Sequence, residues 1–347
     1  MRTTPLQQRV SQGAGKLCIY LGLFFLCFSL TPIHSPHAAS KKKEPGTKQE
    51  STPKVPSSIK KRVEVLSNMN QEIISPLLDF IDTQTGLQYR LSIQENFFFA
   101  SERHYDLFIG TCPQVESIKI SRYQSKALSS LDPALYENGV LAWSRWYSCI
   151  AVNRLFSKEI DFEQKKLKGK ITSVKPENDR FMWLVLYTLY RKYGKAILED
   201  INALIPLYKE SRQELIFTIE SGGYPSVLGI DGYFKKSIEK GYPIDIFYSS
   251  FSPEKYPSIT VAGENVAFIP EGAENTEGAG YVLDYLTGSA FQSFLLQTPF
   301  WPVLHSDKEE PKDVIPIECD MKENEAFETL WREIAFPEII QEIVEEM

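Results

Sequence analysis

The sequence predicts an α/β fold, because two strand–helix–strand units follow one another along the chain. The first unit starts with a strand at residues 62–67 (RVEVLS), continues through a helical pattern and reaches a strand at 105–110 (YDLFIG). The second starts with a strand at 168–174 (KGKITSV), continues through a long apolar helix and reaches a strand at 226–230 (SVLGI). This alternation is typical of layered folds in which helices cover the faces of a sheet.

Local patterns justify each element of the first unit. Residues 62–67 alternate apolar and polar side chains, which is the period of a half-buried strand. The next segment has a helical period and ends at Thr85-Gly86, where glycine supplies the left-handed residue that closes a helix. The strand at 105–110 is apolar enough to be buried on both faces, as in a parallel sheet. The apolar positions of the helix are Ile73, Ile74, Leu77, Leu78, Phe80 and Ile81.

The second unit contains the clearest helix of the chain. Asn178 or Asp179 is the expected N-cap of the helix FMWLVLYTLYRKYG, and Gly194 ends it. Tyr233 follows the strand at 226–230, at the carboxyl end of a sheet strand, where open α/β sheets bind their ligands. The segment between them has a further helical pattern with apolar positions Ile201, Leu204, Ile205 and Leu207.

A helix pair is expected after the strand VAFIP at residues 266–270. Asn275 or Thr276 caps a helix through Leu286, and Gly288 ends it. Ser289, followed by Gln292 three residues later, predicts a capping box at the start of the next helix.

The N-terminal region predicts export. An apolar run at residues 17–30 lies behind three basic residues and is followed by small residues, which is typical of a cleaved secretory signal over residues 1–39, or of an uncleaved anchor. Residues 40–60 are rich in Lys, Pro and Ser and predict a disordered linker. Loss of the signal takes the net charge from −7 to −10, which argues against a nucleic-acid partner.

Cysteine and histidine are too sparse for a disulfide framework or a zinc site. The exported part keeps Cys112, Cys149 and Cys319, a number that allows one bridge and one free thiol. His104 and His305 have no second histidine or cysteine at a metal-binding interval, so no metal or other cofactor is expected.

No catalytic motif is convincing. The segments SIEK (237–240) and SPEK (252–255) match Ser-x-x-Lys, but the companion motifs of serine acyl-transfer enzymes are absent. The chain has no G-x-S-x-G, H-E-x-x-H or phosphate-binding glycine loop, so the sequence predicts a protein that is not an enzyme.

Several landmarks occur in a fixed order between residues 61 and 305. They are LLDFIDTQTG, YDLFIG, ENGVLAWSRWYSCIAVNRL, LKGKI, YRKYG, ESGGYPSVLGIDGYF and AENTEGAGYVLDYLTGSAFQSFL. In this order and spacing the chain resembles the periplasmic solute-binding proteins of ABC transporters, in the two-lobed type 2 group that includes iron(III), thiamine, phosphonate and sugar-phosphate binders.

The resemblance implies two lobes, each a mixed sheet flanked by helices, joined by crossing strands. Residues 61–145 and 260–300 would form lobe 1, and residues 146–259 and 301–347 would form lobe 2. A small solute would bind between the lobes, and the closed protein would dock as a monomer on ABC permease subunits, which places it in the periplasm.

The iron-binding branch implies a site that this sequence lacks. In that branch two adjacent tyrosines bind the metal, with a histidine after the first strand and a carboxylate after the second. Here Tyr233 is followed by Phe234, the first-strand position falls near Asn70, and Thr111 follows Gly110 at the other. Iron(III) would lack the anionic oxygen ligands that it needs, so Tyr233 is expected to donate hydrogen bonds or stack on a solute.

Other residues predict an anionic, organophosphate-like solute. Asn178, Asp179 and Arg180 lie at a helix N-terminus, which favours anions, and Arg180 would add a charged fork unless Asp179 is only a cap and Arg180 faces solvent. The crossing segment contributes an aromatic and cationic cluster that suits an organic anion or, equally, core packing around one arginine. Its members are Trp143, Arg145, Trp146 and Tyr147.

The segment after Gly86 is a departure from the family. It looks shortened, and Phe97, Phe98 and Phe99 within it predict either a buried edge or a surface that contacts a partner. An altered cleft leaves open a second function, a ligand-sensing regulator that acts on a membrane sensor kinase and resembles phosphoglycerate-transport regulators.

Overall fold

The structure is a computed structural model that describes residues 59, 61–94, 104–111, 118–156, 168–248, 250–304, 310–317, 319 and 324–335. These residues belong to one compact unit, Ser51–Met347. The predictions for the signal segment, the linker, Phe97–Phe99, Cys112 and His305 lie outside the described residues. Within the described part, no helix is both long and apolar enough to cross a bilayer.

The strands form one continuous mixed sheet in the order β2-β1-β3-β10-β5-β8-β6-β7, with the short strands β4, β9 and β11 beside β5 and β12 beside β10. β1 is parallel to β2 and β3, whereas β10 is antiparallel to β3 and β5. β6 is parallel to β7 and β8, and β8 is antiparallel to β5. The bounds are β1 Arg62–Ser67, β2 Gln88–Ile93, β3 Leu107–Thr111, β4 Tyr136–Glu137, β5 Val140–Asn153, β6 Ile171–Val174, β7 Tyr208–Lys209, β8 Ser226–Ile230, β9 Ile244–Phe247, β10 Val261–Phe268, β11 Trp301–Pro302 and β12 Ile315–Pro316.

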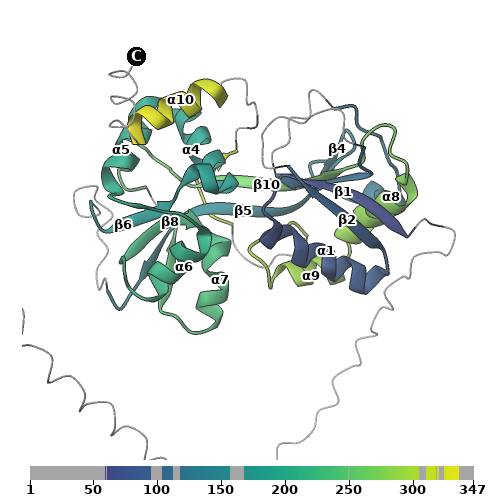
Figure 1. Cartoon of the computed structure of the whole chain (residues 1–347), viewed down its shortest axis with the longest axis horizontal. Coiled ribbons are helices and arrows are strands. Elements are labelled where there is room, and N and C mark those ends of the chain that lie inside the picture. Colours follow the sequence, from purple (N-terminus) through teal and green to yellow (C-terminus); the bar gives the residue numbers. More distant parts are fainter. Residues whose placement is uncertain are drawn as a thin grey trace, which may run out of the picture. The chain divides into compact units, whose positions relative to one another are not determined.

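β5 divides the sheet into two lobes because it changes partners along its length. Its first half pairs with β10 as far as Tyr147, and its second half pairs with β8 from Ser148 onward. Ser148 also ties the second crossing segment to β5, since its hydroxyl donates to the carbonyl of Ile259 and accepts the N–H of Val261. The predicted two-lobed α/β fold with crossing strands is confirmed (Figure 1).

Each half of the sheet has its own helices (Figure 1). In lobe 1, α1 contacts β2 and α8 contacts β1, and α9 contacts β11, the short strand that follows it in the chain. In lobe 2, α6 and α7 pack on β8 and on each other, and α10 packs on α5. The bounds are α1 Gln71–Thr85, α2 Lys126–Ser129, α4 Arg180–Tyr193, α5 Lys195–Leu204, α6 Arg212–Glu220, α7 Asp231–Glu239, α8 Thr276–Leu286, α9 Ser289–Leu295 and α10 Asn324–Ala335, with a 3-10 turn at Pro176–Asn178.

Most of the predicted helix ends are confirmed. Gly86 closes α1 in the left-handed conformation, Asp179 caps α4, Gly194 follows its end, and Asn275 caps α8. The predicted capping box at Ser289 is wrong, because α9 has no side-chain cap.

Gln292 has a different role from the one predicted for it. Its amide nitrogen donates to the carbonyls of Trp143 and Leu286, and its oxygen accepts the N–H groups of Val303 and Leu304. The side chain is buried, so these four bonds join α9 to β5 and to the segment after β11.

The described cysteines differ in their chemistry. Cys149 is free and buried in β5, where burial raises the pKa of its thiol well above the ordinary value. Cys319 is disulfide-bonded. A pairing of Cys112 with Cys149 is therefore excluded, and Cys149 is expected to be unreactive while the protein is folded.

Candidate ligand-binding cleft

The carboxyl ends of parallel strands from both lobes lead into the same region. In lobe 1, β1 leads into α1 and β3 ends at Thr111. In lobe 2, β6 leads through the 3-10 turn into α4, and β8 leads directly into α7. Ligands of open α/β sheets bind at such strand ends, where helix N-termini also present free N–H groups.

A direct contact between the lobes marks the candidate ligand-binding region. Glu72 lies in the first turn of α1, and Arg212 and Gln213 begin α6. The guanidinium Nη2 of Arg212 lies 3.1 Å from Oε2 of Glu72, and the amide of Gln213 donates to the same oxygen. The first turns of α1 and α6 therefore meet at the junction of the two lobes, which we take as the candidate ligand-binding cleft.

The lobe 1 wall is held by a reciprocal pair of hydrogen bonds. Asn68 donates from Nδ2 to the carbonyl of Thr111 at 2.7 Å and accepts the Thr111 N–H at 3.0 Å. A Cβ on Gly110 would lie 2.2 Å from the Asn68 oxygen, so a side chain at this position would displace Asn68. Asn70 is half-buried at the start of α1, and its side chain makes no capping bond.

Tyr233 lies in the lobe 2 wall, inside the first turn of α7 rather than on a turn before it. Its hydroxyl donates to Asp179, with 2.8 and 2.7 Å to the two carboxylate oxygens, and Asp179 also caps α4 by accepting the N–H of Met182. Burial raises the pKa of Asp179, although these hydrogen bonds lower it in part. Burial likewise raises the pKa of Tyr233 well above its ordinary value, so the phenol keeps its proton.

Aromatic packing seals this wall. The ring of Phe181, in the first turn of α4, contacts the rings of Trp146, Tyr233 and Phe300 at centroid distances of 5.2, 6.4 and 6.0 Å. All four side chains are buried. The backbone closes the gap further, because a Cβ on Gly232 would lie only 1.7 Å from the carbonyl oxygen of Pro299.

Asp231 is a buried carboxylate at the junction of α7 with the crossing strands. It accepts hydrogen bonds from the Trp301 indole at 2.6 Å, the Tyr248 hydroxyl at 2.9 Å and the N–H groups of Gly232 and Tyr147. Burial raises the pKa of Asp231 to about 6, and the hydrogen bonds offset part of that shift.

The aromatic and cationic cluster of the sequence is split between core and surface. Trp143, Trp146 and Tyr147 are buried. Arg145 forms ion pairs with Glu264 at 3.1 Å and Glu310 at 2.6 Å. Burial and Glu310 raise the pKa of Tyr147 to about 12.

Asn178 and Arg180 flank the cap of α4 but face different surroundings. The Asn178 amide donates to the carbonyl and the carboxylate of Glu210. Arg180 is 9% exposed, so it does not extend into solvent, and burial lowers its pKa to about 9. Among the predicted site residues, the structure joins Tyr233 to Asp179 directly.

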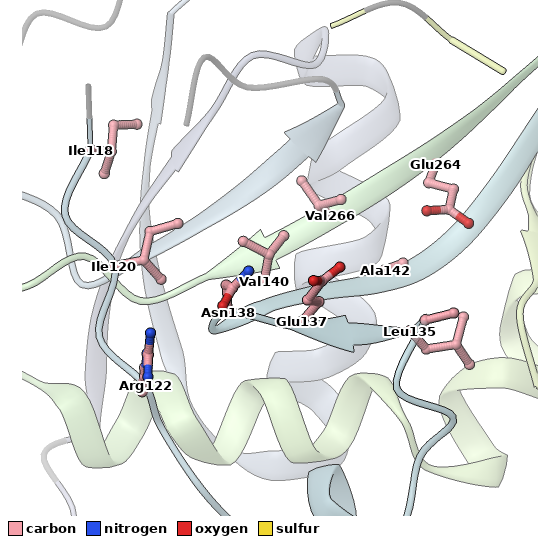
Figure 2. A pocket seen from close by; sticks show the side chains of 11 residues that line it. Ile118, Ile120, Arg122, Leu135, Glu137, Asn138, Val140, Ala142, Glu264 and Val266 are labelled. Atoms are coloured by element: carbon pink, nitrogen blue, oxygen red, sulfur yellow. The ribbon is translucent and has the colours of Figure 1, made fainter. Parts of the chain in front are cut away.

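The described part of the chain contains cavities, of which two bear on the candidate site. A cavity of about 120 Å³ lies between α7 and the α9–β11 segment, next to Asp231, Lys235 and Trp301. A larger cavity of about 540 Å³ lies in lobe 1 over β5 and β10, with Arg122, Glu137 and Glu264 among the side chains around it (Figure 2). None of the predicted site residues lines the larger cavity.

Solved structures resemble this one over most of its length. Apo ferric ion-binding protein A of Pasteurella haemolytica has a TM-score of 0.62 and 18% identity, covering 80% of this chain and 98% of its own. AfuA of Actinobacillus pleuropneumoniae, a periplasmic binding protein with fructose-6-phosphate bound, has a TM-score of 0.58 and 14% identity, covering 78% and 97%. A two-component system protein that mediates signal transduction has a TM-score of 0.55 and 18% identity, covering 77% and 99%. No protein-family model and no curated protein matches the sequence.

The chain has the fold of the two-lobed type 2 periplasmic binding proteins.

Within this fold, the described residues do not assemble a metal site. No group of three or more His, Cys, Asp or Glu side chains in the described ranges is placed to hold a metal ion. The nearest anionic oxygen to Tyr233 is that of Asp179, and the tyrosine donates to it rather than binding through a phenolate.

Arg212 is the cleft residue that sequence reasoning missed. Its guanidinium carbon lies 5.3 Å from the centroid of the Tyr233 ring, and its side chain is only 14% exposed. Its Nη1 is buried and has no hydrogen-bond partner among the described residues. The available signal was Ser211, which caps α6, followed at once by a basic residue.

Proposed function

We propose that the protein is an extracytoplasmic solute-binding subunit of an ABC transporter, which captures a small anionic solute between its lobes. The fold, the helix N-termini at the strand ends and the inter-lobe contact support this function. Periplasmic location, docking on a membrane permease and a monomeric state belong to the same proposal. Residues 61–145 with 260–300, and 146–259 with 301–347, remain the proposed lobe boundaries.

The observation that carries the anionic solute is Arg212. A cation that is mostly buried in the wall of a ligand cleft, with one Nη group unused, favours a carboxylate or phosphate that accepts from both Nη groups. Solved relatives differ in what they hold, and AfuA is described with fructose-6-phosphate. We therefore favour organophosphates such as sugar phosphates or phosphoglycerates.

The other proposed site residues are those predicted from the sequence, and among them Asp179 and Tyr233 support Arg212 rather than contact the solute. Asn70, Gly110 and Thr111 belong to the lobe 1 wall, and Asp179 and Tyr233 to the lobe 2 wall. Asn178 and Arg180 flank the same helix start, and Arg145 and Tyr147 lie on the crossing strand β5.

Iron(III) is disfavoured as the solute by the state of Tyr233. Binding a hard trivalent cation would require the buried phenol to lose its proton and its hydrogen bond to Asp179. The neighbouring position is Phe234, which is buried and has no ligand atom. We expect no visible phenolate-to-iron charge-transfer band when iron(III) is added.

A second candidate function is ligand sensing with a membrane kinase as partner. The similarity of fold to a two-component system protein favours it. The two functions differ in the partner, so copurification with permease subunits supports transport and copurification with a sensor kinase supports sensing. Turnover of a solute would contradict both.

A thermal-shift screen of the mature chain, residues 40–347, tests the proposal. The panel contains sugar phosphates, phosphoglycerates, phosphonates, thiamine, polyamines and iron(III). A solute at 100 times its dissociation constant stabilises the fold by about 2.7 kcal/mol, a readable shift. We expect a shift with a phosphorylated compound, and we expect Arg180→Ala to weaken its binding by about 1 to 3 kcal/mol. Shifts with iron(III) or cations alone would contradict the proposal.

A further inference from the structure

The two members of the inter-lobe ion pair differ in how they are held. Arg212 is only 14% exposed and lies over the Tyr233 ring, so lobe 2 fixes the position of its guanidinium. Glu72 is 62% exposed and reaches it from the first turn of α1 in lobe 1. The cation is therefore part of a wall, whereas the carboxylate is a side chain that can leave.

Glu72 is an incomplete partner for this guanidinium. Only Nη2 of Arg212 lies within bonding distance of Glu72, through the single oxygen Oε2, which also accepts from Gln213. The buried Nη1 has no hydrogen-bond partner among the described residues. A free carboxylate or phosphate, placed without the restraint of a helix, presents two oxygens to both Nη groups and is the better match.

We propose that Glu72 is a built-in substitute for the anionic group of the solute, and that its pair with Arg212 is a latch which holds the lobes together until a solute displaces it. This inference rests on the proposed function for the identity of the displacing group. The latch itself requires only the contact between α1 and α6.

The latch is weak, which suits its role. Exposed ion pairs change an equilibrium by about 1.5- to 5-fold, so Glu72 restrains the lobes without competing strongly against a two-oxygen anion. Because one partner is exposed, salt is expected to screen the latch.

The distance between the lobes in solute-free protein tests the latch. Asp79→Cys on α1 and Lys236→Cys on α7 place nitroxide labels at exposed sites of opposite lobes. The native thiol of Cys149 is buried and Cys319 is in a disulfide, so neither takes a label. Double electron–electron resonance then gives the fractions of short and long distances between the two labels.

We expect Glu72→Gln to raise the fraction of long distances about 1.5- to 5-fold. Salt at 500 mM should do the same to the wild type, and Arg212→Gln combined with Glu72→Gln should add nothing to either single change. The exposed Glu333 on α10 provides a matched control, and Glu333→Gln should leave the distances unchanged. Identical distance distributions for wild type and Glu72→Gln, or additive effects of the Glu72→Gln and Arg212→Gln changes, would overturn the latch. If no solute binds in the thermal-shift screen, the proposed function is refuted, but the distances measured in solute-free protein still test the latch.

Discussion

Two neighbouring parts of the candidate cleft, the start of α7 and the start of α6, differ in how fully their polar side chains are hydrogen-bonded. At the start of α7, Tyr233 and Asp179 satisfy each other, and Phe181 and Gly232 leave no space around them. At the start of α6, Arg212 has an unused Nη group and an exposed partner. A polar group that is buried and fully paired adds stability and is not available to a ligand, so we propose that recognition depends on the incompletely paired Arg212.

This difference explains why Tyr233, at the position of an iron ligand in the iron-binding branch, is not free to bind a solute. Tyr233 keeps its place at the end of β8, but its hydroxyl is committed to the cap of α4. The packed start of α7 therefore holds the Tyr233 ring in place, and this ring in turn positions the guanidinium of Arg212.

The largest expected effect comes from Phe181, the centre of the sealed part. Phe181→Ala should lower the free energy of unfolding by about 3 to 5 kcal/mol, because the cavity it leaves is lined by rings that cannot collapse into it. Urea denaturation measures the change. Phe217, 67% exposed on α6, is the control, and Phe217→Ala should change stability by less than about 0.5 kcal/mol. Equal effects of the two changes would mean that the wall is not sealed.

A methyl group at Gly232 tests the backbone approach of α7 to Pro299. Gly232→Ala should cost about 3 kcal/mol, because the new Cβ meets a carbonyl oxygen at 1.7 Å that cannot rotate away. Gly223→Ala, whose Cβ would meet its nearest neighbours at 3.5 Å, is the matched change and should be close to neutral. A stable Gly232→Ala protein would show that the lobes do not meet at this point.

Asp231 makes stability depend on pH. Its pKa of about 6 in the folded protein lies above the ordinary value of 3.8, so the folded state binds the proton more tightly and this group adds stability as pH falls through 6. Between pH 7.5 and 4 the wild type should gain about 2 kcal/mol relative to Asp231→Asn, which lacks this titration. Parallel denaturation curves at the two pH values give the difference. A constant difference would contradict a buried, proton-binding carboxylate.

Tyr233→Phe should have the smallest of these effects at neutral pH. Loss of the hydroxyl leaves Asp179 with fewer donors and should cost about 1 to 2 kcal/mol, less at pH 4, because the change raises the pKa of Asp179 further and its protonation removes the buried charge. Tyr242→Phe, on a 39% exposed side chain, is the control and should be neutral at both pH values. A pH-independent loss would mean that the pair does not hold a charge.

Elements set by short-range patterns could be predicted from the sequence. The alternation in β1, the glycine that closes α1 and the Asp179 cap of α4 each depend on residues within a few positions. α6 was not predicted, because the apolar Phe217 lies on the exposed face and the polar Thr218 on the buried face, which weakens the apolar period.

Contacts between distant residues could not be predicted. Gln292 matched a local capping pattern, but its amide is used by β5 and the segment after β11, which are adjacent only in the folded chain. Glu72 and Arg212 are 140 positions apart, so no spacing rule relates them. The sequence predicted Tyr233 and Asp179 as site residues, and the fold was needed to find Arg212, whose guanidinium is only partly paired.

Calorimetric titration of the mature protein tests the central claim most directly. Glucose 6-phosphate, 3-phosphoglycerate and iron(III) are titrated separately into wild type, Arg212→Gln and Tyr233→Phe. The account predicts saturable binding of a phosphorylated compound, at least about 5-fold weaker in Arg212→Gln and within about 2-fold of wild type in Tyr233→Phe. Binding of iron(III) that Tyr233→Phe abolishes, or binding of an anion that Arg212→Gln leaves unchanged, would contradict it.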